Sequence, residues 1–251
     1  MSAAASSAKP TIVLLHGVGL DKSVWEPVQE LLDFESVALD LPGHGQQPPL
    51  TSTATLSELG DDVVARLPAG PIHLVGFSLG ALIASNIAIR FPEKITSLTC
   101  VNAVCDRTPE ESAQVAIRLQ AARNDFANSM SIALERWFPE DTPQNHTLRA
   151  ETDKVLMANN VSAYLYAYEV FATGDRELVK DLPTITAPTL AITGENDPGS
   201  TPDMSYRIQK YIPNTQVEII SGARHMLPVT HPKVLAKHLN HHVQQAERIS
   251  S

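Results

Sequence analysis

Three residue types that together support acyl transfer lie far apart in this chain. Ser78 is in the pentapeptide GFSLG, Asp197 is in TGENDPGSTP, and His225 is in SGARHMLPVTHP. A serine hydroxyl is a weak nucleophile near neutral pH, so it needs an adjacent base, which an acid in turn orients. These residue types predict attack by a serine on a carbonyl carbon.

The sequence around Ser78 has the form of a nucleophile elbow. The apolar run PIHLVGF predicts a strand before the serine, and LGALIASNIAIRF predicts a helix after it. Such a turn holds the serine in a strained backbone conformation, and a Cβ at Gly76 or Gly80 would clash across it. The alternative, a chance match in a glycine-containing turn, is disfavoured by the flanking strand and helix.

The acid has more than one candidate. On a fold with this elbow the partners follow in the order serine, acid, histidine. The segment after the penultimate predicted strand offers Glu195 and Asp197, and we prefer Asp197 because it precedes the turn residues Pro198 and Gly199. Asp106 is the rival acid, since it follows the fourth predicted strand, whose end faces the same site.

The base is predicted to be His225, four residues past the last predicted strand. His231 is the alternative, but it precedes a proline at the predicted start of a helix. We interpret six other histidines as structural: loop-tying residues (His16, His44), a core residue (His73) and a solvated helix end (His238, His241, His242).

Acyl transfer also needs hydrogen-bond donors for the negative charge that develops on the carbonyl oxygen. The backbone N–H of Leu79, directly after the nucleophile at a helix start, is one candidate. The loop after the first strand, HGVG, supplies the other, and we choose the N–H of Val18.

The composition is that of an ordinary globular chain. Of 251 residues, 43% are hydrophobic and 19% are charged, and the formal net charge of -9 argues against nucleic acid or an anionic membrane as the main partner. The two cysteines, Cys100 and Cys105, are too few for a disulfide framework, so we expect buried thiols in a reducing compartment. The N-terminus lacks the apolar core of a signal peptide. A cytoplasmic location is the expectation.

Strands and helices alternate along most of the chain. Apolar runs predict strands at 11–17, 36–45, 71–78, 95–104, 187–197 and 215–221. Helical spacing predicts helices at 22–33, 55–67, 79–91, 202–211 and 232–247. Between them lie four further helical segments with no convincing strand, at 110–123, 127–137, 147–157 and 161–172, the last with Gly174 as a stop.

This alternation predicts an α/β fold with a mostly parallel sheet and helices on both faces. We expect a core domain of residues 1–105 and 186–251, with residues 106–185 inserted after the fourth strand as a helical lid. Loops at the carboxyl ends of parallel strands converge on one edge of the sheet, where ligands bind. The three chemical residues fall at those ends.

The motifs taken together resemble the α/β-hydrolase superfamily. VLLHGVG, DLPGHG, HLVGFSLGA, TGENDPGSTP and ARHMLPVTHP occur in that superfamily's order and span nearly the whole chain. The chain is most similar to 3-oxoadipate enol-lactonases and their relatives in aromatic-compound degradation, through VWEPVQELL, FPEKITSLTCVNAV and ALERWFPED. The resemblance implies a triad of Ser78, Asp197 and His225 with an oxyanion hole at Val18 and Leu79. Because the usual opening hairpin is missing, about six strands are expected.

Aromatic residues of the lid are candidates for the substrate pocket. They are Trp137, Phe138, Tyr164 and Tyr168, although packing of the lid onto the core explains them equally well. One lid arginine is a candidate for binding a substrate carboxylate, and the rest are read as surface charge: Arg118, Arg123, Arg136, Arg149 and Arg176.

The function expected is that of a serine esterase or lactonase cleaving a small ester, lactone or enol-lactone. Hydrolysis of a small amide or of a carbon–carbon bond needs the same triad and stays open, as does perhydrolase chemistry. A non-catalytic receptor and a cofactor-free oxygenase are weaker alternatives. The partner expected is a small-molecule substrate, with no cofactor, metal, nucleic acid or membrane, and the protein is a monomer or homo-oligomer.

Overall fold

The computed structural model describes residues 11–250, and its centre is one parallel β-sheet. Six strands lie in the order β2-β1-β3-β4-β5-β6, and each neighbouring pair is parallel. Their bounds are β1 (Thr11–Leu15), β2 (Glu35–Leu39), β3 (Ile72–Phe77), β4 (Ile95–Val101), β5 (Thr189–Gly194) and β6 (Thr215–Ile220). The predicted α/β architecture with six strands is confirmed.

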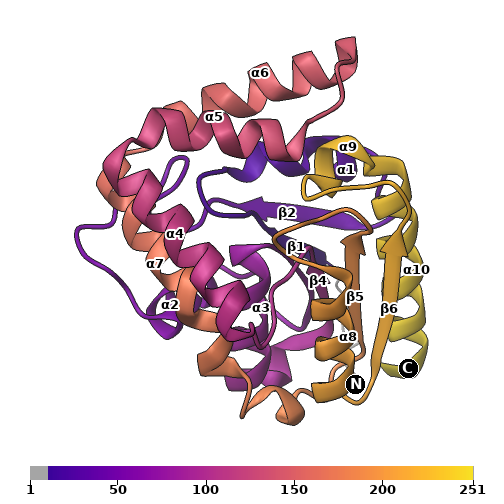
Figure 1. Ribbon diagram of the computed structural model, residues 1–251. Helices are drawn as coiled ribbons and strands as arrows, with labels where there is room; N and C mark the ends of the chain where they lie inside the picture. Colours follow the sequence, from indigo (N-terminus) through magenta and orange to yellow (C-terminus); the bar gives the residue numbers. More distant parts are fainter. Residues whose placement is uncertain (1–10, 251) are drawn as a thin grey trace, which may run out of the picture.

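Helices cover both faces of this sheet (Figure 1). One face carries α1 (Glu26–Gln29) and α10 (Pro232–Ser250), with α9 (Leu227–Thr230) beside them. The other carries α2 (Leu56–Ala65), α3 (Leu79–Arg90) and α8 (Pro202–Tyr211). Short 3₁₀ turns occur at η1 (Lys22–Trp25), η2 (Pro92–Lys94) and η3 (Leu182–Thr184).

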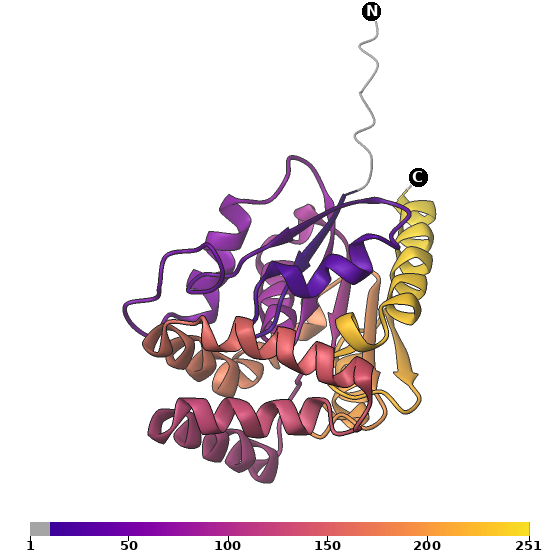
Figure 2. The same ribbon diagram turned by 90° about the horizontal axis from the view of Figure 1, so that it is seen from above.

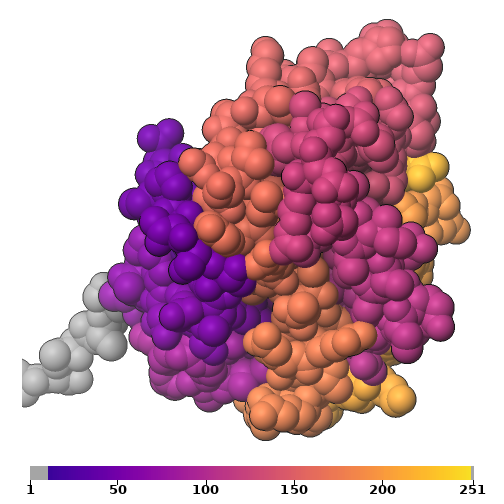
Figure 3. Space-filling model, turned by 60° about the vertical axis from the view of Figure 1, so that its left-hand side comes forward, coloured from indigo at the N-terminus to yellow at the C-terminus, as the bar shows by residue number. Residues whose placement is uncertain are grey.

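Four helices form an insert between β4 and β5. They are α4 (Pro109–Asn124), α5 (Phe126–Trp137), α6 (Pro143–Met157) and α7 (Val161–Leu178). Figures 1 and 2 show them as a layer over the end of the sheet to which the strand arrows point. In the space-filling view the magenta α4 and the orange α7 lie side by side on the surface (Figure 3). The insert therefore covers the edge where the sequence places its chemical residues.

The core explains why the central strands are nearly continuous apolar runs. All six residues of β3 are buried, because helices cover both sides of a parallel sheet. Helix α3 is buried around most of its circumference. Its small residues Ala81, Ala84, Ser85 and Ala88 allow it to lie close to the sheet. The elbow serine is thus held between two rigid, buried elements.

Two expectations about helices were wrong. Segment 22–33 is not one helix but η1 followed by the single turn α1, because Pro27 has no N–H to continue the α-helical ladder. Gly174 does not end α7, which continues to Leu178. A Cβ at Gly174 would lie 3.5 Å from both Leu56 and Leu82, which is an ordinary contact distance, so this position packs against the core without requiring glycine.

Residues 11–250 contain no helix with both the length and the apolar character needed to cross a membrane.

Candidate active site

Ser78 occupies the sharp turn between β3 and α3. Its φ of 55° and ψ of -114° lie outside the regions that side-chain-bearing residues normally adopt. A Cβ on Gly76 would lie 2.2 Å from the carbonyl oxygen of Gly80, and one on Gly80 would lie 2.4 Å from that of Leu15. The turn therefore closes only with glycine at both flanking positions, and the Ser78 N–H secures it by donating to Val101 O at 3.0 Å.

Asp197 and His225 are joined directly. His225 Nδ1 lies 2.6 Å from Asp197 Oδ2, and the carboxylate is almost completely buried. Asp197 Oδ1 accepts the backbone N–H groups of Gly199 (2.9 Å) and Ser200 (3.0 Å). Burial alone would raise the pKa of Asp197, but the charge and hydrogen bond of His225, with these backbone donors, hold it below its ordinary value. Asp197 is thus kept as a carboxylate.

Asn102 also contacts this carboxylate and was missed by the sequence analysis. Its side-chain amide donates to Asp197 Oδ2 at 2.8 Å and to Thr193 Oγ1 at 3.2 Å. It sits one residue past β4 with a φ of 44°, in the left-handed region that asparagine tolerates better than most residues. The signal for it is an asparagine near a strand's carboxyl end, but the apolar run predicts a strand through residue 104, whereas β4 ends at Val101.

The other acid candidates lie elsewhere. Asp106 accepts a 2.5 Å hydrogen bond from the hydroxyl of Tyr211 on α8. Glu195 accepts from Ser221 Oγ and the Gly222 N–H and so braces the loop after β6. Of the three carboxylates weighed in the sequence, the structure brings Asp197 to His225.

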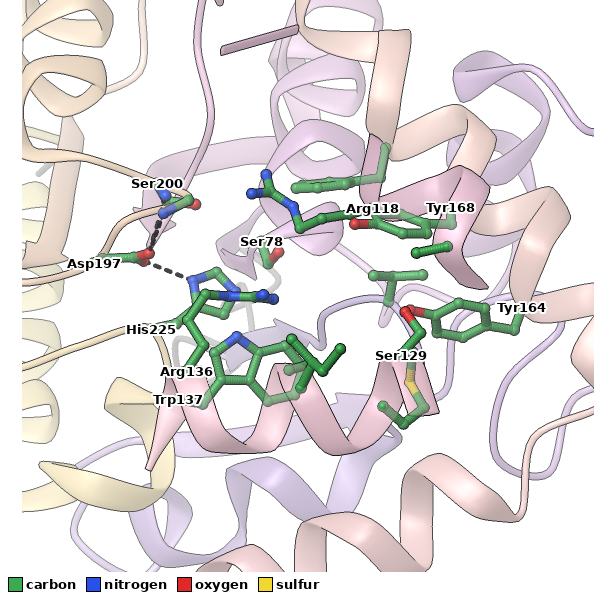
Figure 4. A pocket seen from close by; sticks show the side chains of 17 residues that line it. Ser78, Arg118, Ser129, Arg136, Trp137, Tyr164, Tyr168, Asp197, Ser200 and His225 are labelled. Atoms are coloured by element: carbon green, nitrogen blue, oxygen red, sulfur yellow. Dashed lines mark hydrogen bonds and ion pairs between the residues drawn. The ribbon is translucent and has the colours of Figure 1, made fainter. Parts of the chain in front are cut away.

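The imidazole of His225 lies between two aromatic rings. Phe77 of the core is 5.1 Å away between ring centroids, and Trp137 of α5 stacks on it at 5.7 Å with an interplanar angle of 23°. Figure 4 shows Ser78 beside His225 in one pocket, with Asp197 on the side of the imidazole away from Ser78. The insert therefore contributes one wall of the histidine's surroundings.

The remaining histidines are mostly structural, as expected. His16 Nε2 accepts the N–H of Leu41 at 2.9 Å, and His44 packs edge-on against it at 5.2 Å. His73 is buried on β3 and contacts Ser97 Oγ. The interpretation of His242 as solvated was wrong: α10 packs it against β4, where Nε2 contacts Leu98 O, and burial lowers its pKa to about 4.

The loop after β1 approaches the start of α3. The N–H of Gly80 donates to His16 O at 3.1 Å, which holds the loop against the elbow. Within residues 11–250, neither the Val18 nor the Leu79 N–H has a backbone acceptor. Gly19, with a φ of 76°, receives a 2.7 Å hydrogen bond at its carbonyl from Asn159 between α6 and α7. Leu79 directly follows Ser78 in the chain, and Val18 lines the same pocket as Ser78.

The pocket over Ser78 has a volume of about 110 Å³ and is bounded largely by α4, α5 and α7. This is well below the range typical of sites for drug-sized ligands, so it suits a small molecule. Trp137, Tyr164 and Tyr168 line it, as does Val18. Phe138 does not: it caps the end of α5 and is buried in the core. No group of three or more His, Cys, Asp or Glu in the described residues is arranged to hold a metal ion.

This chain is similar in sequence to a family of known proteins. The family described as alpha/beta hydrolase fold matches residues 10–232. An (E)-2-((N-methylformamido)methylene)succinate hydrolase of Acinetobacter baylyi is 30% identical over 88% of this chain and 86% of its own. The 3-oxoadipate enol-lactonase 1 of the same organism is 29% identical over 89% and 85%.

A solved structure shows the same fold. The enol-lactonase of Burkholderia xenovorans superposes with a TM-score of 0.85 at 23% identity, covering 96% of this chain and 94% of that one. With the family match over nearly its whole length, this chain belongs to the α/β-hydrolase family.

Proposed function

We propose that the protein is a serine hydrolase that cleaves a small ester, lactone or enol-lactone through an acyl-enzyme. Ser78 is the nucleophile, His225 the base and Asp197 the acid. The observation that carries the proposal is the 2.6 Å contact of Asp197 with His225 Nδ1, in the same pocket as the strained Ser78.

The first half of the reaction follows from this hydrogen bond. Because Asp197 accepts the proton on Nδ1, the tautomer of His225 leaves the lone pair on Nε2 free. Nε2 takes the Ser78 hydroxyl proton as the oxygen attacks the substrate carbonyl. The negative charge that moves onto the carbonyl oxygen meets the N–H groups of Val18 and Leu79, and removing one such donor typically costs roughly 3 kcal/mol.

The second half uses the same groups. The tetrahedral intermediate collapses, and His225 gives its proton to the leaving oxygen. Water then attacks the acyl-Ser78 ester while His225 accepts its proton, and the acid product leaves with Ser78 restored. Asp197 stays ionised throughout and stabilises the imidazolium that forms twice per turnover.

We propose that residues 106–185 act as the lid of this site, over a core of residues 1–105 and 186–251. Trp137, Tyr164 and Tyr168 place apolar surface over Ser78 and shield the reacting carbonyl from bulk water. The pocket volume of about 110 Å³ favours a compact acyl group.

A second candidate is hydrolysis of a small amide. The relative at 30% identity is a hydrolase named for an N-methylformamido compound. The same triad and oxyanion donors serve an ester or an amide, since both pass through a tetrahedral intermediate. A panel of esters, lactones and formamides separates the two.

The test is labelling with a serine-directed fluorophosphonate together with turnover of short 4-nitrophenyl esters. The wild-type protein should bind one equivalent of probe, and Ser78→Ala should bind none and lose ester turnover. Ser85→Ala is the matched control: Ser85 lies on the same helix but donates to the Ala81 carbonyl at 2.8 Å, away from the pocket, so its variant should label like wild type. Equal turnover of esters by wild type and Ser78→Ala would overturn the proposal.

A further inference from the structure

Two arginines of the insert reach into the pocket over Ser78. Arg118 comes from α4 and Arg136 from α5, and both line the pocket. Figure 4 shows their guanidinium groups entering from different helices, with Ser78 between them in that view. Both are partly shielded from solvent. A protein with a net charge of -9 therefore places two positive charges beside its candidate nucleophile.

Neither guanidinium is paired. Within residues 11–250, no carboxylate lies at salt-bridge distance from Arg118 or Arg136, and neither donates a hydrogen bond to another residue. The insert's other arginines all have partners: Arg107 with Asp175, Arg123 with Glu169, Arg149 with Glu135, and Arg176 with Ser112. The unpaired arginines are thus the two that face the pocket.

Among the described residues, the pocket offers no carboxylate that is free to pair with these two arginines. Of the pocket-lining residues in the range 11–250, Asp197 is the one with an acidic side chain. Its oxygens already accept four hydrogen bonds. Burial lowers the pKa of Arg136, and the nearby charge of Arg118 lowers it further. Two like charges held close together in a partly buried site destabilise the empty pocket, and an anionic ligand relieves that repulsion.

We propose that Arg118 and Arg136 recognise a substrate that carries two carboxylates in addition to its scissile carbonyl. Each guanidinium presents a planar fork that matches one carboxylate. With both filled, the scissile carbonyl is held at Ser78 while the acidic end lies under α4 and α5. This inference rests on the proposed function and names its substrate class, a small dicarboxylic ester, lactone or amide.

Binding of dicarboxylates tests the inference without needing turnover. The Ser78→Ala protein is titrated calorimetrically with succinate and glutarate, and with butyrate and valerate as monocarboxylates of equal chain length. The dicarboxylates should bind at least about tenfold more tightly, since a charge-assisted hydrogen-bonded pair typically contributes a factor of about 10 to 100. Arg118→Gln and Arg136→Gln, each added to Ser78→Ala, should each reduce that preference to within about threefold.

Arg123→Gln is the matched control, because Arg123 is on the same helix as Arg118 but pairs with Glu169 outside the pocket. Its variant should keep the full preference. Equal affinity for dicarboxylates and monocarboxylates, or a preference that survives both pocket substitutions, would refute the inference. This outcome is distinct from failure of the proposed function. The proposed function is refuted if ester turnover does not depend on Ser78, regardless of the affinity measured for dicarboxylates.

Discussion

Replacing Asp197 by asparagine tests the proposed triad at its most constrained group. The carboxylate accepts four hydrogen bonds, two at Oδ1 from backbone N–H groups and two at Oδ2 from Asn102 and His225. An asparagine has one oxygen to place. With that oxygen at the Oδ1 position, both backbone donors stay satisfied, and the new NH₂ faces Asn102 and His225.

Asn102 can adapt to this orientation of the new asparagine, but His225 is then held in the wrong tautomer. The Asn102 Oδ1 atom is buried without a hydrogen-bond partner, so a flip of that amide lets it accept from the new NH₂. His225 then accepts at Nδ1 and carries its proton on Nε2, the wrong tautomer to receive the Ser78 proton. The opposite orientation leaves two backbone N–H groups unpaired, which costs about 1–3 kcal/mol for each buried group.

We therefore expect Asp197→Asn to fold and to lose about 10⁴-fold in kcat, or about 5.5 kcal/mol of transition-state stabilisation. Steady-state turnover of a 4-nitrophenyl ester measures the loss, and thermal unfolding checks the fold. Asp106→Asn is the matched variant, since Asp106 pairs with the Tyr211 hydroxyl and should lose less than about threefold. If Asp106→Asn were the inactive protein and Asp197→Asn retained a tenth of the activity, the reasoning would be refuted.

Two further predictions concern Trp137, which stacks on His225, and His242, which packs against β4. Trp137→Leu should lower kcat/KM about fivefold in steady-state assays, because the stack of Trp137 on His225 contributes about 1 kcal/mol. Trp137→Phe keeps an aromatic ring and should recover most of the lost kcat/KM. Equal losses in the two variants would contradict the stacking role. The pKa of His242 is about 4 in the folded protein and 6.5 in a model peptide. As the pH falls from 6.5 towards 4, the unfolded chain therefore binds a proton at His242 before the folded protein does, and the free energy of unfolding decreases. Urea denaturation measures the decrease in unfolding free energy between pH 7 and pH 5, and this decrease should be about 2 kcal/mol smaller in His242→Gln than in wild type. An identical decrease in the two proteins would contradict the prediction.

Much of this architecture is local in sequence and therefore predictable. An apolar run predicts β3, two glycines around the serine predict the elbow, and a helical pattern predicts α3, all within about twenty residues. The order of strands and helices then places Ser78, Asp197 and His225 at one edge, because parallel strands end on the same side.

What escaped prediction depends on contacts between distant segments. Asn102 reaches Asp197 because β4 and β5 are neighbours in the sheet, so an asparagine at a strand end can indicate a site residue but does not identify its partner. His242 looks like a surface residue until α10 is packed on β4. Helix packing likewise decides which arginines of the insert form ion pairs. Arg118 and Arg123 lie on the same helix and look alike in the sequence, but Arg118 faces the pocket and Arg123 pairs with Glu169.

The contact of Asn159 with Gly19 ties the junction of α6 and α7 to the loop that carries Val18. Its 2.7 Å hydrogen bond joins the α6–α7 junction to that loop, and a Cβ on Gly19 would lie 2.6 Å from the ring of Tyr164. Helices and loop cannot separate without breaking this bond and unpacking that ring. If Val18 supplies an oxyanion donor as proposed, moving these helices away to admit a ligand would break this hydrogen bond and displace one of the two proposed donors.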